Sequence, residues 1–173
     1  MLGKSSWITL KAEVAQVLLD RAFQRSLHSG EAEKAWGWAD TWPVAEIRVP
    51  RLGARSIVLN GASGEALAFG PALLAETAKP GERGTSVIAA HRDTHFDFLG
   101  DLEPGDEIAV ERADGVTTRF LVTGSRVVRF DAFGIDPGAG VRRLVLATCW
   151  PLDAVTNGPL RLVVEAELAG TRD

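Results

Sequence analysis

The chain of 173 residues contains a single cysteine, Cys149. One thiol can form neither an intramolecular disulfide nor a multi-cysteine zinc site, so both frameworks are excluded within one chain. A free cysteine is most often a small buried hydrophobe. Any catalytic role for Cys149 therefore has to be argued from the residues around it.

The sequence also has no excess of basic residues, because 19 Lys and Arg stand against 23 Asp and Glu, giving a formal net charge of −4. Without a basic stripe, nucleic acid is not an expected partner. No apolar run approaches the roughly 18 to 20 residues of a membrane-spanning helix. The start, MLGKSSWITLK, lacks the apolar region and cleavage site of a signal peptide. The length fits one domain with a substantial core.

Residues 7–38 are expected to be helical, because apolar residues recur at three- and four-residue steps and form one stripe. The stripe consists of Ile8, Ala12, Ala15, Leu18, Leu19, Ala22 and Phe23. A break at 28–30 would separate a second helix over 31–38. We therefore expect a helical segment at 1–41 and a β domain at 42–173. The helix either packs on that domain or lies near a membrane surface.

After Pro43, short apolar runs alternate with turn residues, a pattern typical of a closed barrel or a sandwich. Asp114-Gly115, between two β-rich runs, is the clearest hairpin turn. Strands are expected at Ala45–Val49, Ser56–Leu59, Ser86–Ala90, Glu107–Glu111, Thr117–Thr123, Arg126–Arg129, Leu144–Thr148 and Leu160–Leu168.

Two of these runs end in a residue that can do chemistry. Cys149 ends one run, and the proline two residues later must stop ladder pairing there. His91 ends another. If the two strands are neighbours, thiol and imidazole meet at one rim, where an imidazolium favours the thiolate and later protonates a leaving amine. The alternative is a structural histidine.

Arg161 opens the last expected strand and shares a face with Val163 and Glu165. A permanent cation near a thiolate could stabilise an oxyanion or hold a substrate carbonyl. The alternative is a surface arginine.

Three short motifs together are more specific than any of these residues alone. H-R-D-T at 91–94, T-C-W-P at 148–151 and N-G-P-L-R at 157–161 resemble the sortase family of cysteine transpeptidases. Leu146 replaces the first threonine of the family's T-x-T-C pattern.

The resemblance extends over the β region, from about Trp42 to Leu168. The stretch 42–53 looks like the first barrel strand, and 79–92 looks like the strand that leads to the histidine. The residues of these motifs are most similar to those of the proteobacterial, Gram-negative branch known as class GN or marine sortases.

The resemblance implies a mainly β fold, a closed eight-stranded barrel with N-terminal helix or helices and the site at one end. Cys149 would attack the threonine carbonyl of an LPxTG-like motif near the C-terminus of a protein substrate, forming a thioester that an amine acceptor resolves. His91 would be the general acid/base and Arg161 the oxyanion or substrate stabiliser. Thr148 and Trp150 would contact substrate, and no metal or cofactor is expected.

Family members usually carry an N-terminal membrane anchor. The resemblance therefore implies a catalytic domain on the periplasmic side of the inner membrane. We expect residues 1–6 to be wholly or partly foreign to the native protein, and the anchor to precede Trp7 in the parent protein.

Metal-binding alternatives rest on spacing. His91 and His95 are four residues apart, as in helical zinc motifs. However, Arg92 stands where a metalloprotease has glutamate, and the residues before His91 are expected to form a strand instead of a helix. A calcium site is the other candidate, built from Asp93, Asp97, Asp101, Glu103 and Asp106.

Three non-metal alternatives also stay open. An L,D-transpeptidase normally has its arginine about two residues after the cysteine, where this chain has Pro151. A hydrolytic cysteine peptidase shares the first half of the sortase reaction. A silent barrel that binds peptides would leave Cys149 unreactive.

Overall fold

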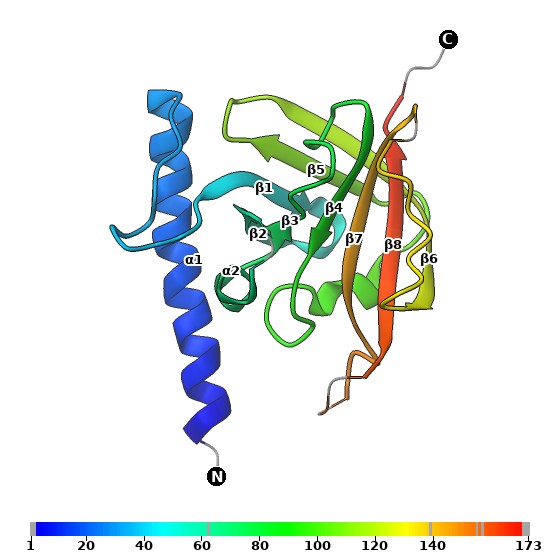
Figure 1. The fold of residues 1–173 in the computed structure, drawn as a ribbon, viewed down its shortest axis with the longest axis horizontal. Coiled ribbons are helices and arrows are strands. Elements are labelled where there is room, and N and C mark those ends of the chain that lie inside the picture. Colours follow the sequence, from blue (N-terminus) through cyan, green and yellow to red (C-terminus); the bar gives the residue numbers. More distant parts are fainter. Residues whose placement is uncertain (1–2, 62, 139, 155, 157, 171–173) are drawn as a thin grey trace.

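In the computed structural model, residues 3–61, 63–138, 140–154, 156 and 158–170 are described. A long helix stands beside a closed barrel of eight strands, which confirms the expected fold class (Figure 1). The elements are α1 (Gly3–Ser29), β1 (Pro43–Val49), η1 (Pro50–Leu52), β2 (Ala54–Asn60), α2 (Gly64–Phe69), β3 (Ala72–Leu73), β4 (Gly84–Ala89), η2 (Asp97–Asp101), β5 (Glu107–Arg112), β6 (Thr117–Arg129), β7 (Arg142–Trp150) and β8 (Leu160–Leu168).

The order of the strands around the barrel places the site. It runs β1-β2-β3-β4-β7-β8-β6-β5 and closes. β4 and β7 pair in parallel, whereas β7 and β8 pair antiparallel. Because β4 and β7 run in the same direction, their C-terminal ends lie at the same end of the barrel (Figure 1).

The eight observed strands are not the eight expected ones. The two strands expected over 117–123 and 126–129 form one strand, β6, which absorbs a register shift between Val122 and Gly124. The eighth strand is β3, which has only two residues and so shows no alternation that a sequence pattern could reveal. The expected hairpin at Asp114-Gly115 is confirmed, since it joins β5 to β6 with Gly115 at φ 83°.

The expected second helix over 31–38 is wrong. α1 ends at Ser29, and Gly30 adopts φ 75° with its N–H donating to the Ser26 carbonyl at 2.9 Å. Tertiary contacts hold the chain after it. The Glu33 amide donates to the Ser26 hydroxyl at 3.0 Å, and the Trp36 ring packs edge-on against Phe69 with centroids 5.1 Å apart.

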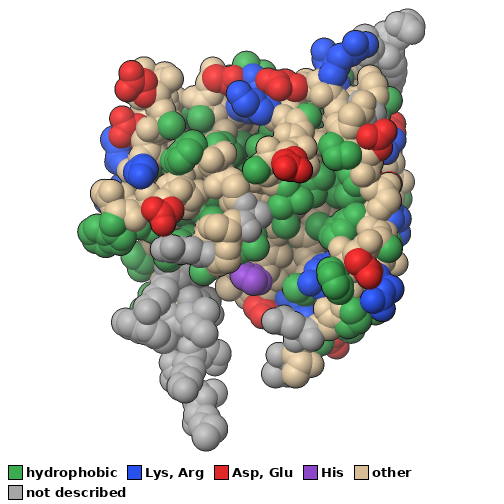
Figure 2. Space-filling model, in the orientation of Figure 1, with side chains coloured by type: hydrophobic (Ala, Val, Ile, Leu, Met, Phe, Trp, Pro, Cys, Tyr) green, Lys and Arg blue, Asp and Glu red, His purple; other side chains and the backbone are tan. Residues whose placement is uncertain are grey.

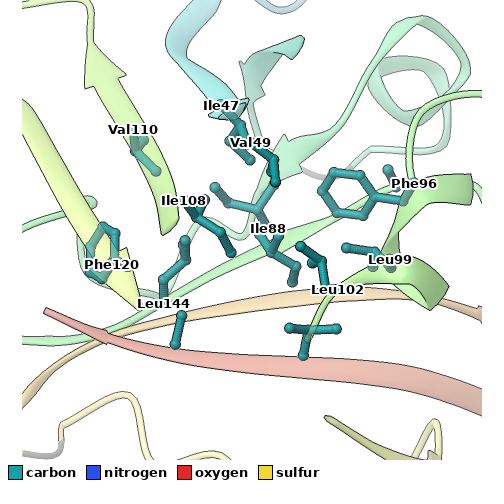
Figure 3. Close-up of a cluster of buried hydrophobic side chains, with 14 of the residues drawn as sticks. Ile47, Val49, Ile88, Phe96, Leu99, Leu102, Ile108, Val110, Phe120 and Leu144 are labelled. Carbon is teal, nitrogen blue, oxygen red and sulfur yellow. The ribbon is translucent and has the colours of Figure 1, made fainter. Parts of the chain in front are cut away.

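The barrel core consists of side chains that point inward from all around the sheet (Figure 3). Ile88 from β4 and Leu144 from β7 meet Ile108 and Phe120 from β5 and β6. The segment after β4 closes one end, where Phe96, Leu99 and Leu102 are buried in the same cluster. This packing fixes the position of the backbone that follows His91.

The helix α1 packs on the barrel through a second cluster, as one of the two alternatives expected. Leu19 and Phe23 are fully buried against Ile57 and Leu59 of β2. The expected stripe is only partly right, because Leu18 is 37% exposed. Among helices in the described part of the chain, none combines the length and apolarity needed to cross a membrane.

Candidate active site

Cys149 and Arg161 lie directly opposite each other on the antiparallel strands β7 and β8. Residues in direct register project on the same face of a sheet, so both side chains point the same way. That face is the outer one, because Ala147 and Val163, two residues along each strand, belong to the cluster outside the barrel. Both Cys149 and Arg161 are half-buried.

His91 continues the same row on the other side of Cys149. The parallel register of β4 and β7 ends with Ala89 opposite Ala147. The Ala90 amide closes this last pair by donating to the Ala147 carbonyl at 3.1 Å. The exposed His91 lies two residues beyond Ala89, so continuing this register past the end of β4 would place it level with Cys149. Cys149 and Arg161 thus share one row on β7 and β8, which His91 extends from just past the end of β4.

The Arg161 guanidinium is held by neutral groups. Its Nη1 donates to the carbonyls of Gly158 and Leu160, each at 2.8 Å. Its central carbon lies 5.9 Å from the centre of the Phe130 ring, within the range of a cation–π contact. These partners orient the guanidinium without neutralising it, so a positive charge stays available on the strand opposite the thiol.

Thr148 and Trp150 point away from this row, as side chains alternate along a strand. Thr148 is 2% exposed, and its hydroxyl donates to the Ala90 carbonyl at 2.8 Å. Trp150 packs against the barrel core. The substrate contact expected of these two residues stays a prediction. Asn157, part of the third motif, lies outside the described residues.

An apolar groove of about 220 Å³ runs along the outer face of β4 and β7. It is lined by Leu74, Thr77, Val87, Ala89, Phe133, Ile135, Pro137 and Ala147. Ala89 precedes His91 by two residues, and Ala147 precedes Cys149 by two, so the groove leads towards the row. Figure 2 shows hydrophobic side chains gathered on this face, with charged side chains mainly around its border.

Arg92 is a structural link that the sequence did not reveal. It is 3% exposed, and its Nη2 donates to the carbonyls of Ala154 and, at 3.1 Å, of Thr156. Its Nε donates to Asp93 at 3.2 Å. An arginine directly after a strand resembles a surface residue, and only its burial distinguishes it. Arg92 ties the segment that carries His91 to the loop that follows Cys149.

His95 is buried close to His91. It is 7% exposed, and its Nε2 has no hydrogen-bond partner among the described residues. Burial lowers the pKa of His95 to about 4, helped by the charge of His91 and opposed by Asp97. The imidazole is therefore neutral at neutral pH.

The metal alternatives find little support. His91 is exposed whereas His95 is buried, so the two differ in their access to a shared ion. In the calcium candidate, Arg51 occupies both carboxylate oxygens of Asp106, at 2.5 and 2.7 Å. Within the described ranges, no three His, Cys, Asp or Glu side chains gather as a metal site would need.

Comparison with known families agrees with this geometry. A family model described as the sortase domain matches residues 47–169. The chain belongs to the sortase family. The match covers most of the barrel, and it favours the sortase prediction over the L,D-transpeptidase alternative.

The relatives come from several sortase classes. Sortase D of Bacillus subtilis (strain 168) is 29% identical over 118 residues, which cover 68% of this chain and 60% of that relative's length. Sortase E from Streptomyces avermitilis is 31% identical with a TM-score of 0.60, covering 74% of this chain and 88% of the other. A Clostridium perfringens sortase D5 transpeptidase, at 19% identity, shares the fold with a TM-score of 0.71 over 91% of this chain and 98% of the other. The class GN branch stays a prediction.

Proposed function

We propose that this sortase is a cysteine transpeptidase that cuts a C-terminal, LPxTG-like sorting motif and transfers the acyl group to an amine. The observation that carries the proposal is the row of His91, Cys149 and Arg161 at the end of the apolar groove. It combines a nucleophile, an acid/base group and a cation beside a place for an extended peptide.

The three residues of the row divide the proposed reaction between them. The Cys149 sulfur attacks the carbonyl carbon of the motif's threonine. Negative charge then develops on the carbonyl oxygen, near the Arg161 guanidinium. His91 donates a proton to the departing amine as the thioester forms. The acceptor amine then attacks the thioester and returns the Cys149 thiol.

The groove supports a substrate with apolar residues before the cut. Its lining is almost entirely hydrophobic, and the β4 and β7 residues in it alternate towards His91 and Cys149. The leucine and proline of an LPxTG-like motif could bury apolar surface there, while the threonine carbonyl reaches the thiol.

Mass spectrometry tests the proposal most directly. The protein is incubated with labelled LPxTG-like peptides, with and without a panel of amines. We expect an acyl-enzyme on Cys149 and a ligated product, both lost in Cys149→Ala. If the peptide is released only as the hydrolysed free acid, even at high amine concentration, the protein is instead a hydrolytic peptidase. An unreactive Cys149 that no motif peptide protects from alkylation would identify a silent peptide-binding barrel.

The proposed activity belongs on the outer side of a membrane. We infer that the parent protein is anchored in the inner membrane of a Gram-negative, class GN host, with this barrel in the periplasm. Fractionation of cells that express the parental gene tests this inference. Recovery of the full-length protein from the cytosolic fraction would contradict it.

A further inference from the structure

A second hollow, of about 780 Å³, lies between α1, β2 and the segment that follows His91. It differs from the apolar groove because charged and polar side chains line much of it. Four of them are carboxylates: Glu13 and Asp20 from α1, and Asp93 and Asp97 from the segment after β4. A space of this size accommodates several residues of a peptide or a small molecule.

The hollow carries net negative charge. The cation in its lining, Arg55, is already paired with Asp20 at 2.6 Å and with the buried Glu46. Asp93 pairs with Arg92 at 3.2 Å. Glu13 and Asp97 add two further carboxylates. A cleft lined by one sign of charge raises the local concentration of the opposite charge.

A buried polar group in the lining also indicates a ligand. His95 lines the hollow, is only 7% exposed, and has an Nε2 without a partner among the described residues. A buried polar atom left unpaired is costly, and a water, an ion or the polar group of a ligand can satisfy it. A neutral imidazole and nearby carboxylates together suit a ligand that donates N–H groups.

The hollow lies on the side of Cys149 that carries His91, the proposed acid/base group. In the row, Arg161 lies on one side of Cys149, on β8, and His91 lies on the other side, just after β4. α1 and β2 lie beyond β4 on that second side, away from β8 (Figure 1). By microscopic reversibility, the group that protonates the leaving amine also takes the proton from the incoming one.

We propose that this acidic hollow is the binding site of the acceptor amine, and that it selects acceptors carrying positive charge and no nearby carboxylate. The inference rests on the proposed transpeptidase function. The amine nitrogen forms a bond to the thioester carbon as the carbon–sulfur bond breaks. The amine proton passes to His91, and the Cys149 sulfur leaves as a thiolate that regains the proton.

The test compares two acceptors of different charge. Acyl-enzyme formed from a labelled sorting peptide is mixed with triglycine amide or with triglycine bearing a free C-terminal carboxylate. We expect the amide to have the lower KM. In the double variant Glu13→Gln, Asp97→Asn, the acyl-enzyme still forms, KM for triglycine amide rises about fivefold, and the preference over the free acid disappears. Asn at 97 keeps the acceptor oxygen that the Phe98 amide uses at 2.8 Å.

Glu103→Gln is the matched control, because Glu103 is exposed and lies outside the hollow. It should leave both acceptor KM values unchanged. Equal KM values for the two acceptors in the parent protein, or a double variant that behaves like the control, would overturn the hollow's role while acyl-enzyme still forms. Absence of acyl-enzyme in the parent protein would refute the transpeptidase function itself and with it the inference that rests on it.

Discussion

At the scale of single residues, the setting of Arg161 explains how a surface-like arginine could serve the reaction. Arg161 is the register partner of Cys149, and two backbone carbonyls and the Phe130 ring hold its guanidinium without cancelling its charge. A preorganised cation stabilises developing negative charge without having to reorganise during the reaction.

We expect Arg161→Ala to lower kcat/KM for a sorting peptide by about 100-fold or more, as loss of one oxyanion donor does in other enzymes. Steady-state kinetics measure this, and the fall should lie mainly in kcat. The rate of Cys149 alkylation serves as control for an intact thiol. Near-normal turnover would remove Arg161 from the proposed chemistry.

His95 should make the fold sensitive to mild acid. Burial lowers its pKa from 6.5 to about 4, so the unfolded chain takes up a proton first as the pH falls. The free energy of unfolding should therefore fall between pH 6.5 and about 4, by about 3 kcal/mol, and this loss should end below that window. Urea unfolding at several pH values measures it.

His95→Gln provides the comparison for this effect. The variant should lose the decline between pH 6.5 and 4, because glutamine does not titrate. The pKa values of Asp106 and Asp114 are lowered by hydrogen bonds from Arg51 and Arg112, so their stabilisation is lost only below the ordinary value of 3.8. Parallel curves for the two proteins would contradict the assignment to His95.

At the scale of elements, one buried arginine joins the two segments that carry the row. Arg92 follows His91 and donates to two carbonyls of the loop after Cys149. The loop is thereby tied to β4 as well as to β7 and β8, which it connects. The position of His91 relative to Cys149 thus depends on a contact that lies outside the row.

We expect Arg92→Met to reduce the free energy of unfolding by about 3 kcal/mol, since hydrogen bonds from a charged donor are lost in a buried site. The kcat for the sorting peptide should fall as well, and Arg92→Lys should recover part of it. Urea unfolding and steady-state kinetics measure the two effects. The exposed Arg83, changed to Met, is the control. An Arg92→Lys protein with normal stability but a lowered kcat would show that Arg92 positions His91 in addition to stabilising the fold.

Sequence patterns predicted the elements that follow simple periodicity. Both strands that carry Cys149 and Arg161 are predictable nearly to their ends, because each contains a long apolar run. The two-residue β3 and the continuous β6 were missed, since one is too short for a pattern and Gly124-Ser125 in the other looks like a turn. Helical periodicity over 31–38 was outweighed by tertiary contacts of Trp36.

At the scale of the whole molecule, the parallel pairing of β4 and β7 was beyond pattern analysis. It joins residues about 58 positions apart, as the Thr148–Ala90 hydrogen bond shows. The sequence predicted that His91 and Cys149 end strands, and the family resemblance supplied their meeting at one rim. The burial of Arg92 and His95 also depends on this long-range packing, so no local signal pointed to either residue.

The helix α1 belongs to the folded unit through a few large side chains. We expect Phe23→Ala to lower the free energy of unfolding by 3–5 kcal/mol, because Phe23 is fully buried between α1 and β2. Urea denaturation measures this. Val17→Ala, at an exposed position of the same helix, should change it by less than about 0.5 kcal/mol. A small effect of Phe23→Ala would mean that α1 folds independently of the barrel.

The short strand β3 gives the closed barrel one weak seam. β2 is joined to β3 by two register pairs, and β3 to β4 by two more, whereas β7 and β8 pair from Arg143 to Trp150. Local opening of a fold begins where the fewest interactions must break. The barrel can therefore open locally between β2 and β4, the strand that precedes His91, while the β7–β8 pair that carries Cys149 stays closed.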